Sequence, residues 1–220
     1  MSNIIQESRE KIVRLGKLMF DRHLTDLAGG NLSIRVGDEV LMTPKYAGSK
    51  YQWDLRPEQI IRMDLKGNKI DGEGDISREA KVHLIILNNF YPHVTSVVHG
   101  HARNVLVYCA AEKPMPSVFY ETSKFGEIQL TRDAASGTTD LADYVLEVME
   151  AEREKIETKN VAACMMPRHG LVVAAKDVEM GVDATERIDT NAYLLLQAAL
   201  IGGASSLVGK DVPFNPDYDK

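Results

Sequence analysis

The sequence has little cysteine, no surplus of basic residues and no long apolar run, and each shortage excludes a class of protein. Only two cysteines occur among 220 residues, Cys109 and Cys164, and both lie in apolar segments where cysteine usually behaves as a small buried hydrophobe. We therefore expect neither a disulfide nor a cysteine ligand to a metal. The formal net charge of −6 and the pI near 5.6 argue against nucleic acid as a partner, because binding to phosphates needs clustered Lys and Arg.

The chain also lacks a segment that reads as a membrane span or a signal peptide. No apolar run approaches the roughly 20 residues that span a bilayer, and the start MSNIIQESREK has neither a basic n-region nor an apolar h-region. We find no internal repeat, low-complexity tract or long linker. Since 44% of the residues are hydrophobic and 26% charged, we expect one cytoplasmic globular domain over residues 1–220, with an extended tail at about 204–220.

The hydrophobic pattern predicts interleaved helices and strands. Apolar residues near helical spacing predict a first helix over residues 3–23, and short alternating segments between residues 32 and 70 predict strands joined by tight turns. Several connections are too short for crossovers, so a mixed or antiparallel sheet covered by helices fits better than a doubly wound parallel sheet. The further expected elements are helices over 77–89, 102–111, 138–155 and 177–203, and strands over 94–101, 127–130, 161–166 and 170–175.

Two histidines in the segment VVHGHA, residues 97–102, are the most informative residues of the chain. Every second side chain of a strand leaves the same face, so His99 and His101 would point the same way. Two neutral imidazoles can share a divalent transition metal, and His169, on a short turn between two apolar runs, offers a third ligand. The pair alone is a weak signal, because two strand-end histidines bonded to backbone or water would have the same spacing.

Glu79 lies near the start of the helix that precedes the histidine strand, about one turn from an expected cap at Ser77 or Asp75. A carboxylate is favoured at a helix N-terminus, and it would emerge at the same end of the fold as the histidines. Beside a metal it could act as a fourth ligand or move protons as general acid or base. The alternative is a solvated glutamate at a helix start. His83, one turn further on among apolar neighbours, is better explained as a core histidine with one hydrogen bond.

Four motifs in order, GGNLSIR, SRE, HGHA and RHG, resemble the class II aldolase/adducin family over residues 5–200. The family includes zinc-dependent fuculose-phosphate aldolases and ribulose-5-phosphate 4-epimerases, decarboxylases, dehydratases and metal-free adducin head domains. The resemblance implies an α/β fold, a three-layer α/β/α sandwich around a mixed, largely antiparallel sheet, and a homotetramer with sites between subunits. It also implies that His99, His101 and His169 bind one Zn²⁺ per chain. Glu79 would be a further ligand and the catalytic acid/base.

The resemblance suggests roles for further residues near this centre. Tyr120 resembles a tyrosine that reaches the neighbouring subunit in family aldolases and protonates the oxygen of the leaving aldehyde; the alternative is an interfacial or core tyrosine. Family members that take sugar phosphates hold the phosphate with small donors, of which Asn31 and Ser77 are present here. Lys45 and Arg78 stand where that pattern has other residues. Their charge could hold a phosphate or a carboxylate, or each could be a solvated surface charge.

One metal centre of this kind could support several reactions. A hydroxy-ketone can bind zinc through its carbonyl and adjacent hydroxyl oxygens, and the metal stabilises the enediolate left when the neighbouring carbon–carbon bond breaks. We therefore expect a zinc-dependent aldolase acting on a small hydroxy-ketone, with a ketose phosphate as the favoured substrate. Sugar-phosphate 4-epimerisation, decarboxylation of a 3-keto acid and dehydration are alternatives, and Mn²⁺, Fe²⁺ or Co²⁺ could replace Zn²⁺. An adducin-like interaction module is the non-enzymatic alternative.

Overall fold

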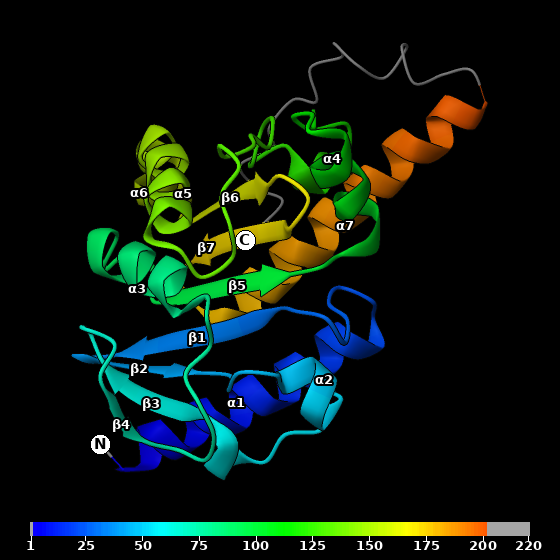
Figure 1. Cartoon of the computed structure of the whole chain (residues 1–220). Coiled ribbons are helices and arrows are strands. Elements are labelled where there is room, and N and C mark those ends of the chain that lie inside the picture. Colours follow the sequence, from blue (N-terminus) through cyan, green and yellow to red (C-terminus); the bar gives the residue numbers. More distant parts are fainter. Residues whose placement is uncertain (1, 202–220) are drawn as a thin grey trace.

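A computed structural model describes residues 2–201, and its central element is a seven-stranded sheet with helices on both faces (Figure 1). The strand order is β4-β3-β2-β1-β5-β7-β6, and each neighbouring pair in the described chain is antiparallel. The strands are β1 (Asn31–Val36), β2 (Glu39–Met42), β3 (Ile61–Asp64), β4 (Lys69–Asp71), β5 (Ser96–Gly100), β6 (Val161–Met166) and β7 (Gly170–Ala175).

The helices form two layers that cover opposite faces of the sheet. Helices α1, α4 and α7 pack on one face, and α3, α5 and α6 pack on the other. The three-layer α/β/α sandwich expected from the sequence is therefore confirmed. The bounds are α1 (Ser2–Asp21), α2 (Ala47–Tyr51), α3 (Ala80–Asn89), α4 (Arg103–Ala111), α5 (Thr139–Ala151), α6 (Arg153–Lys159) and α7 (Val178–Leu200), with 3₁₀ turns at Pro57–Gln59 and Tyr120–Thr122.

The two layers divide the core because successive strand residues face opposite sides of the sheet. On β5, Val98 packs in the cluster beneath α1, α4 and α7, whereas Val97 packs in the cluster beneath α3, α5 and α6. Every residue of β6 and β7 is buried, which explains why these strands appear in the sequence as continuous apolar runs. The central strands are thus held firmly on both faces.

Three expected elements differ from the structure. Residues 127–130 do not form a strand, because Ile128 and Leu130 each make only an isolated bridge, and to different partners. Alternating apolar and polar residues predict an extended backbone, but a strand of a sheet also needs one neighbouring segment that pairs with it in register. The helix expected over 138–155 is divided at Glu152 into α5 and α6, and the helix expected from residue 77 begins at Ala80.

Other expectations about the chain can be compared directly with the structure. Cys109 and Cys164 are both free and buried, and burial raises the pKa of the Cys109 thiol to about 12. Between residues 2 and 201, no helix combines the length and the apolar character needed to cross a membrane. The tail expected at about 204–220, and the last two residues of the helix expected over 177–203, lie outside the described residues.

Candidate active site

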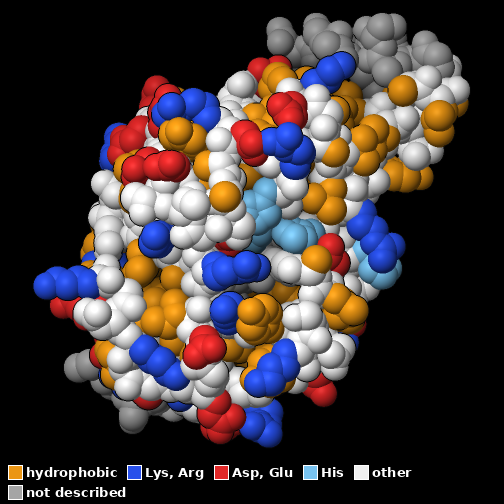
Figure 2. Space-filling view, in the orientation of Figure 1, with side chains coloured by type: hydrophobic (Ala, Val, Ile, Leu, Met, Phe, Trp, Pro, Cys, Tyr) orange, Lys and Arg blue, Asp and Glu red, His pale blue; other side chains and the backbone are white. Residues whose placement is uncertain are grey.

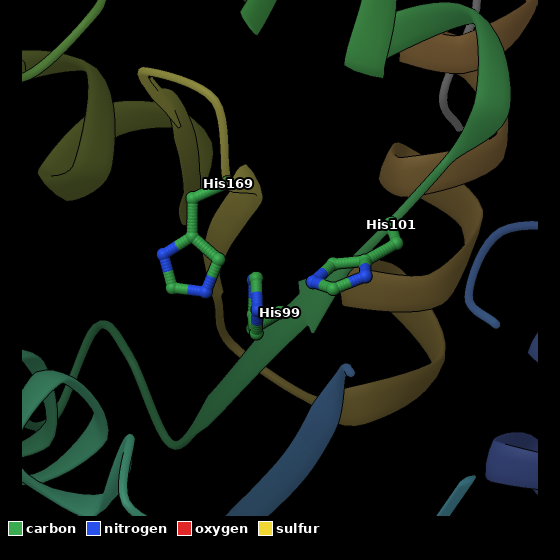
Figure 3. Close-up of side chains that lie close together, drawn as sticks. All are labelled: His99, His101 and His169. Atoms are coloured by element: carbon green, nitrogen blue, oxygen red, sulfur yellow. The ribbon is translucent and has the colours of Figure 1, made fainter. Parts of the chain in front are cut away.

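Three histidines meet at one end of the sheet. His99 is in β5, His101 follows one residue beyond the end of that strand, and His169 lies in the turn between β6 and β7. The antiparallel pairing of β5 with β7 places this turn beside the end of β5. Figure 3 shows the three imidazoles converging, with ring centroids 4.9–5.9 Å apart. One nitrogen from each ring lies within 4.8 Å of the other two, so the group can hold a metal ion.

Hydrogen bonds outside the group select the nitrogen that two of the imidazoles, His99 and His101, can offer. His99 Nδ1 lies 2.9 Å from the carbonyl oxygen of Leu171, and His101 Nδ1 lies 3.1 Å from Asp26 Oδ1. Both partners are acceptors, so each Nδ1 carries the proton and each Nε2 keeps its lone pair. His101 Nε2 is buried and has no hydrogen-bond partner among residues 2–201. An inward-facing basic nitrogen without a partner is what a metal ligand requires, so the residues fit the implied ion.

The surroundings favour neutral imidazoles. Burial lowers the pKa of His99 well below its ordinary value, and the neighbouring His169 and His101 lower it further. Burial also lowers the pKa of His169, although the Glu79 carboxylate opposes this effect. Neutral rings are the form that binds metal, so His99 and His169 need not lose a proton before an ion enters at neutral pH.

The glycine loop before β1 leaves space for the histidines. A Cβ on Gly29 would lie 2.2 Å from His101 Cε1, and a Cβ on Gly30 would lie 2.1 Å from Thr25 Oγ1. Gly30 also has a φ of +96°, which side-chain-bearing residues rarely adopt. The motif GGN therefore permits close approach of backbone and ligand at this point.

Glu79 is the residue immediately before α3 and is itself the N-cap, which corrects the expected cap at Ser77 or Asp75. Its side chain is only 7% exposed, so it is not a solvated glutamate. Oε1 accepts a hydrogen bond from Ser136 Oγ and lies 3.9 Å from His169 Nε2. Oε2 is buried and has no partner in the described part of the chain. The carboxylate is therefore held beside the imidazoles with one oxygen unused.

His83 has the structural role expected for it. It is fully buried, and its Nδ1 lies 2.7 Å from Ser33 Oγ. Burial lowers its pKa to about 3, so the ring is neutral in the folded protein. His83 is not part of the three-histidine group.

The histidines and Glu79 line a cleft of about 240 Å³, which suits a small molecule. The four residues expected to bind substrate, Asn31, Lys45, Ser77 and Arg78, all line it as well. Asn31 Nδ2 donates to Ser77 Oγ at 3.4 Å, while Asn31 Oδ1 is buried without a partner in residues 2–201. Figure 2 shows histidine side chains at the surface near the middle of this face, with Lys and Arg side chains beside them.

Tyr120 does not line this cleft. It lies in the 3₁₀ turn Tyr120–Thr122 and its side chain is 49% exposed. Two residues that the sequence did not single out do belong to the site: Asp26, which holds His101, and Ser136, which holds Glu79. Asp26 lies three residues before the GGN motif, so the motif could have indicated it. Ser136 lies in a turn sequence that carries no such signal.

Comparisons with known proteins agree with this geometry. Residues 10–196 match the family model described as Class II Aldolase and Adducin N-terminal domain. The chain is 28% identical over 200 residues to a 5-deoxy-D-ribulose 1-phosphate aldolase from Bacillus thuringiensis. The aligned region covers 90% of this chain and 89% of that protein. It is 27% identical over 193 residues to a 3-oxo-tetronate 4-phosphate decarboxylase from Haemophilus influenzae, with 84% and 85% covered.

A solved structure of an L-fuculose 1-phosphate aldolase has the same fold. It matches with a TM-score of 0.75 and 21% sequence identity, over 96% of this chain and 91% of that chain. At this identity the likeness concerns the fold alone. Together with the curated relatives and the family match, it confirms the expectation of an enzyme of the class II aldolase type. The chain belongs to the class II aldolase and adducin family.

Proposed function

We propose that this chain is a zinc-dependent aldolase that cleaves or forms a carbon–carbon bond in a ketose phosphate. The observation that carries the proposal is the buried carboxylate of Glu79, with an unused oxygen, beside three converging imidazoles at the base of a small cleft. A ligand set of three imidazoles and an adjacent carboxylate is typical of catalytic zinc. Mn²⁺, Fe²⁺ and Co²⁺ use similar ligands, so the identity of the metal is part of the proposal.

His99, His101 and His169 would hold the ion, and Glu79 would lie beside it as a further ligand or as the proton carrier. A bound divalent cation would supply Lewis-acid stabilisation of the negative charge that develops on the ketose oxygens as the carbon–carbon bond breaks. Asp26 and the carbonyl of Leu171 would keep two of the imidazoles oriented, because each accepts the Nδ1 proton.

Glu79 is the group we assign to proton transfer. In the condensing direction it would remove a proton from the hydroxyl-bearing carbon next to the ketone, and the electron pair left on that carbon would attack the aldehyde. In the cleaving direction Glu79 would return the proton to the same carbon. The buried position and the unpartnered Oε2 support this role, because a largely desolvated and oriented carboxylate is an effective base.

The anionic end of the substrate would be bound by four side chains, those of Lys45, Arg78, Asn31 and Ser77. Two cationic and two small polar side chains line the cleft, and two of the four, Ser77 and Arg78, lie just before the start of α3. A helix N-terminus favours anions, and Arg and Lys both bind phosphate strongly. The aldolase and the decarboxylase to which this chain is similar are both named for phosphorylated substrates, which supports phosphate over carboxylate.

Tyr120 is assigned a role across a subunit boundary. Its half-exposed side chain lies outside the cleft of its own chain, and this position supports a contact with the cleft of a neighbouring copy in a homotetramer. There it would donate a proton to the aldehyde oxygen as the carbon–carbon bond forms, and in the cleaving direction the same oxygen would give its proton back to the tyrosine oxygen as the aldehyde leaves. We further propose that residues 1–220 form one domain of a cytoplasmic enzyme of carbohydrate metabolism.

Decarboxylation of a phosphorylated 3-keto acid is the second candidate. The similarity to a 3-oxo-tetronate 4-phosphate decarboxylase favours it over epimerisation and dehydration, and it would need the same stabilisation of charge at the metal. In this reaction carbon dioxide leaves in place of the aldehyde, and Glu79 would only return a proton to carbon.

The test begins with elemental analysis of the purified full-length protein. The protein is then incubated with dihydroxyacetone phosphate and a panel of small aldehydes. These are the condensation substrates because retro-aldol cleavage of a ketose 1-phosphate between C3 and C4 yields dihydroxyacetone phosphate and an aldehyde. About one zinc per chain with condensation products detected by mass spectrometry would support the proposal. Zinc without condensation, but with release of carbon dioxide from a phosphorylated 3-keto acid, would favour the decarboxylase. Absence of any bound metal after zinc loading would refute both.

Two substitutions separate metal binding from proton transfer. Glu79→Gln keeps the size of the side chain but cannot accept the proton, so we expect much of the zinc to remain while turnover is lost. His101→Ala removes a ligand and should lose both zinc and turnover. A Glu79→Gln enzyme with unchanged turnover would remove Glu79 from the proton-transfer role.

A further inference from the structure

The loop over residues 131–138 carries Ser136 to the wall of the cleft and is anchored on both sides. The Thr131 backbone N–H donates to the carbonyl oxygen of Met165 at 2.8 Å, which ties the start of the loop to β6. Asp133 forms an ion pair with Arg168, the residue immediately before His169. The loop is thereby connected to the same turn that presents one of the proposed metal ligands.

The other end of the loop packs against the backbone that precedes Glu79. Gly137 has a φ of +79°, and a Cβ on it would lie 3.1 Å from Arg78 Cβ and 3.3 Å from the carbonyl oxygen of Arg78. A side chain here would crowd Arg78 and would be strained by the positive φ. Gly137 therefore allows the loop to approach so closely that Ser136 lies beside Glu79.

Ser136 donates its hydroxyl proton to Glu79 Oε1, although the two residues are 57 positions apart in the sequence. The bond occupies one carboxylate oxygen and leaves Oε2, which is buried and unpartnered among the described residues, as the available base. We propose that Ser136 is a positioning residue that holds the Glu79 carboxylate in the orientation needed to exchange a proton with substrate. This inference rests on the proposed function, because it assigns the group that orients the proposed proton carrier.

The physical reason is that a glutamate has three rotatable side-chain bonds, and its last bond turns freely unless a donor holds one oxygen. A hydrogen bond to an ionised group is stronger than one between neutral groups. Loss of the Ser136 hydroxyl would leave Oε1 dependent on His169, at 3.9 Å, and would allow the carboxylate to rotate. Small misplacements of a catalytic group can reduce a rate by about 100-fold.

The first experiment measures proton transfer without an aldehyde. Zinc-loaded full-length protein is mixed with dihydroxyacetone phosphate in heavy water, and exchange of the carbon-bound proton for deuterium is followed by proton NMR. We expect Ser136→Ala to slow exchange by about 10- to 100-fold with little change in the half-saturating concentration of dihydroxyacetone phosphate. Ser136→Thr retains the hydroxyl and should restore most of the rate.

Thr139→Ala is the matched control. Thr139, the first residue of α5, is three positions after Ser136 and is exposed. It accepts a hydrogen bond from Lys81 Nζ at 3.2 Å. Its exchange rate should equal that of the wild type. An unchanged rate in Ser136→Ala would overturn the proposal, as would a fall in rate caused by weaker binding of dihydroxyacetone phosphate alone.

A second measurement does not depend on activity. Urea unfolding midpoints of the metal-free protein are compared for Ser136→Ala, Glu79→Ala and the double variant. If Ser136 holds Glu79, Ser136→Ala lowers the midpoint in the wild-type background and has no further effect once Glu79 is alanine. Additive shifts would overturn the proposal. If the metal-loaded wild type exchanges no deuterium, the proposed function is refuted instead. Non-additive midpoints would then still support a hydrogen bond through which Ser136 holds Glu79 in place.

Discussion

Asp26 provides the sharpest test of how the histidine group is organised. Its Oδ1 lies 3.1 Å from His101 Nδ1 and also accepts hydrogen bonds from the backbone N–H groups of Ala28 at 2.8 Å and Gly29 at 3.0 Å. One carboxylate oxygen therefore orients a proposed metal ligand and shapes the glycine loop beside it. The side chain is 45% exposed, so water weakens but does not abolish its charge interaction with the ring.

Two substitutions separate these effects. Asp26→Asn removes the negative charge but keeps an amide oxygen that can accept the same hydrogen bonds, whereas Asp26→Ala removes the acceptor as well. Partners of metal-bound histidines contribute about 10- to 100-fold in metal affinity, which corresponds to about 1.4–2.7 kcal/mol. We expect Asp26→Asn near the lower end of that range, because only the charge is lost, and Asp26→Ala near the upper end.

The assay is competition for zinc between the full-length protein and a chromophoric chelator of known affinity. Asp38→Ala is the control, because Asp38 is an almost fully exposed carboxylate in the turn between β1 and β2. Its zinc affinity should match that of the wild type. An Asp26→Ala protein that binds zinc as tightly as the wild type would refute the reasoning, since His101 would then need no partner to remain a ligand.

Three further predictions concern the cleft and the core. Gly29→Ala would place a Cβ 2.2 Å from His101 Cε1, so the ring must move and zinc content, measured by elemental analysis, should fall sharply. His83 has an ordinary pKa of 6.5 that burial lowers to about 3, so the folded state binds fewer protons than the unfolded state in this range, and the free energy of unfolding falls as the pH drops below about 6.5. The loss of unfolding free energy that His83 causes should reach about 2 kcal/mol at pH 5. Urea titrations at several pH values should show that His83→Gln lacks this loss. Equal pH dependence of the wild type and His83→Gln would contradict the prediction. Lys45→Ala should raise KM for a phosphorylated substrate with little change in kcat. The control is Lys50→Ala, which should leave KM unchanged because Lys50 is exposed and does not line the cleft. An equal KM in both variants would mean that Lys45 is a solvated surface charge.

Much of the site could be predicted from the sequence because its ligands lie in strongly patterned segments. The apolar runs of β6 and β7 are unbroken except at the turn, so the position of His169 between two strands followed from the sequence. His99 lies in the expected strand, β5, although that strand ends at Gly100 and His101 follows directly after it. The helix expected from residue 138 begins there: Thr138 is the N-cap of α5, and its side chain accepts a hydrogen bond from the backbone N–H of Leu141.

The elements that were predicted wrongly depend on distant contacts. Residues 127–130 have the alternation of a strand, but whether they pair depends on segments that happen to lie beside them. The first helical residue after Ser77 is Ala80, and no local signal in the sequence distinguished Glu79 from its neighbours as the N-cap. Element boundaries of this kind are decided by packing, which local patterns reflect only in part.

The sequence by itself determined the family, the layered α/β architecture and the histidines that can bind a metal, because each depends on residue type and on short, regular spacing. Only the tertiary structure decided which side chains hold those residues in place. Asp26 reaches His101 across 75 positions of sequence, and Ser136 reaches Glu79 across 57. Such bonds arise when loops from separate elements meet at one end of the sheet, and no periodicity within either segment records where the other will lie.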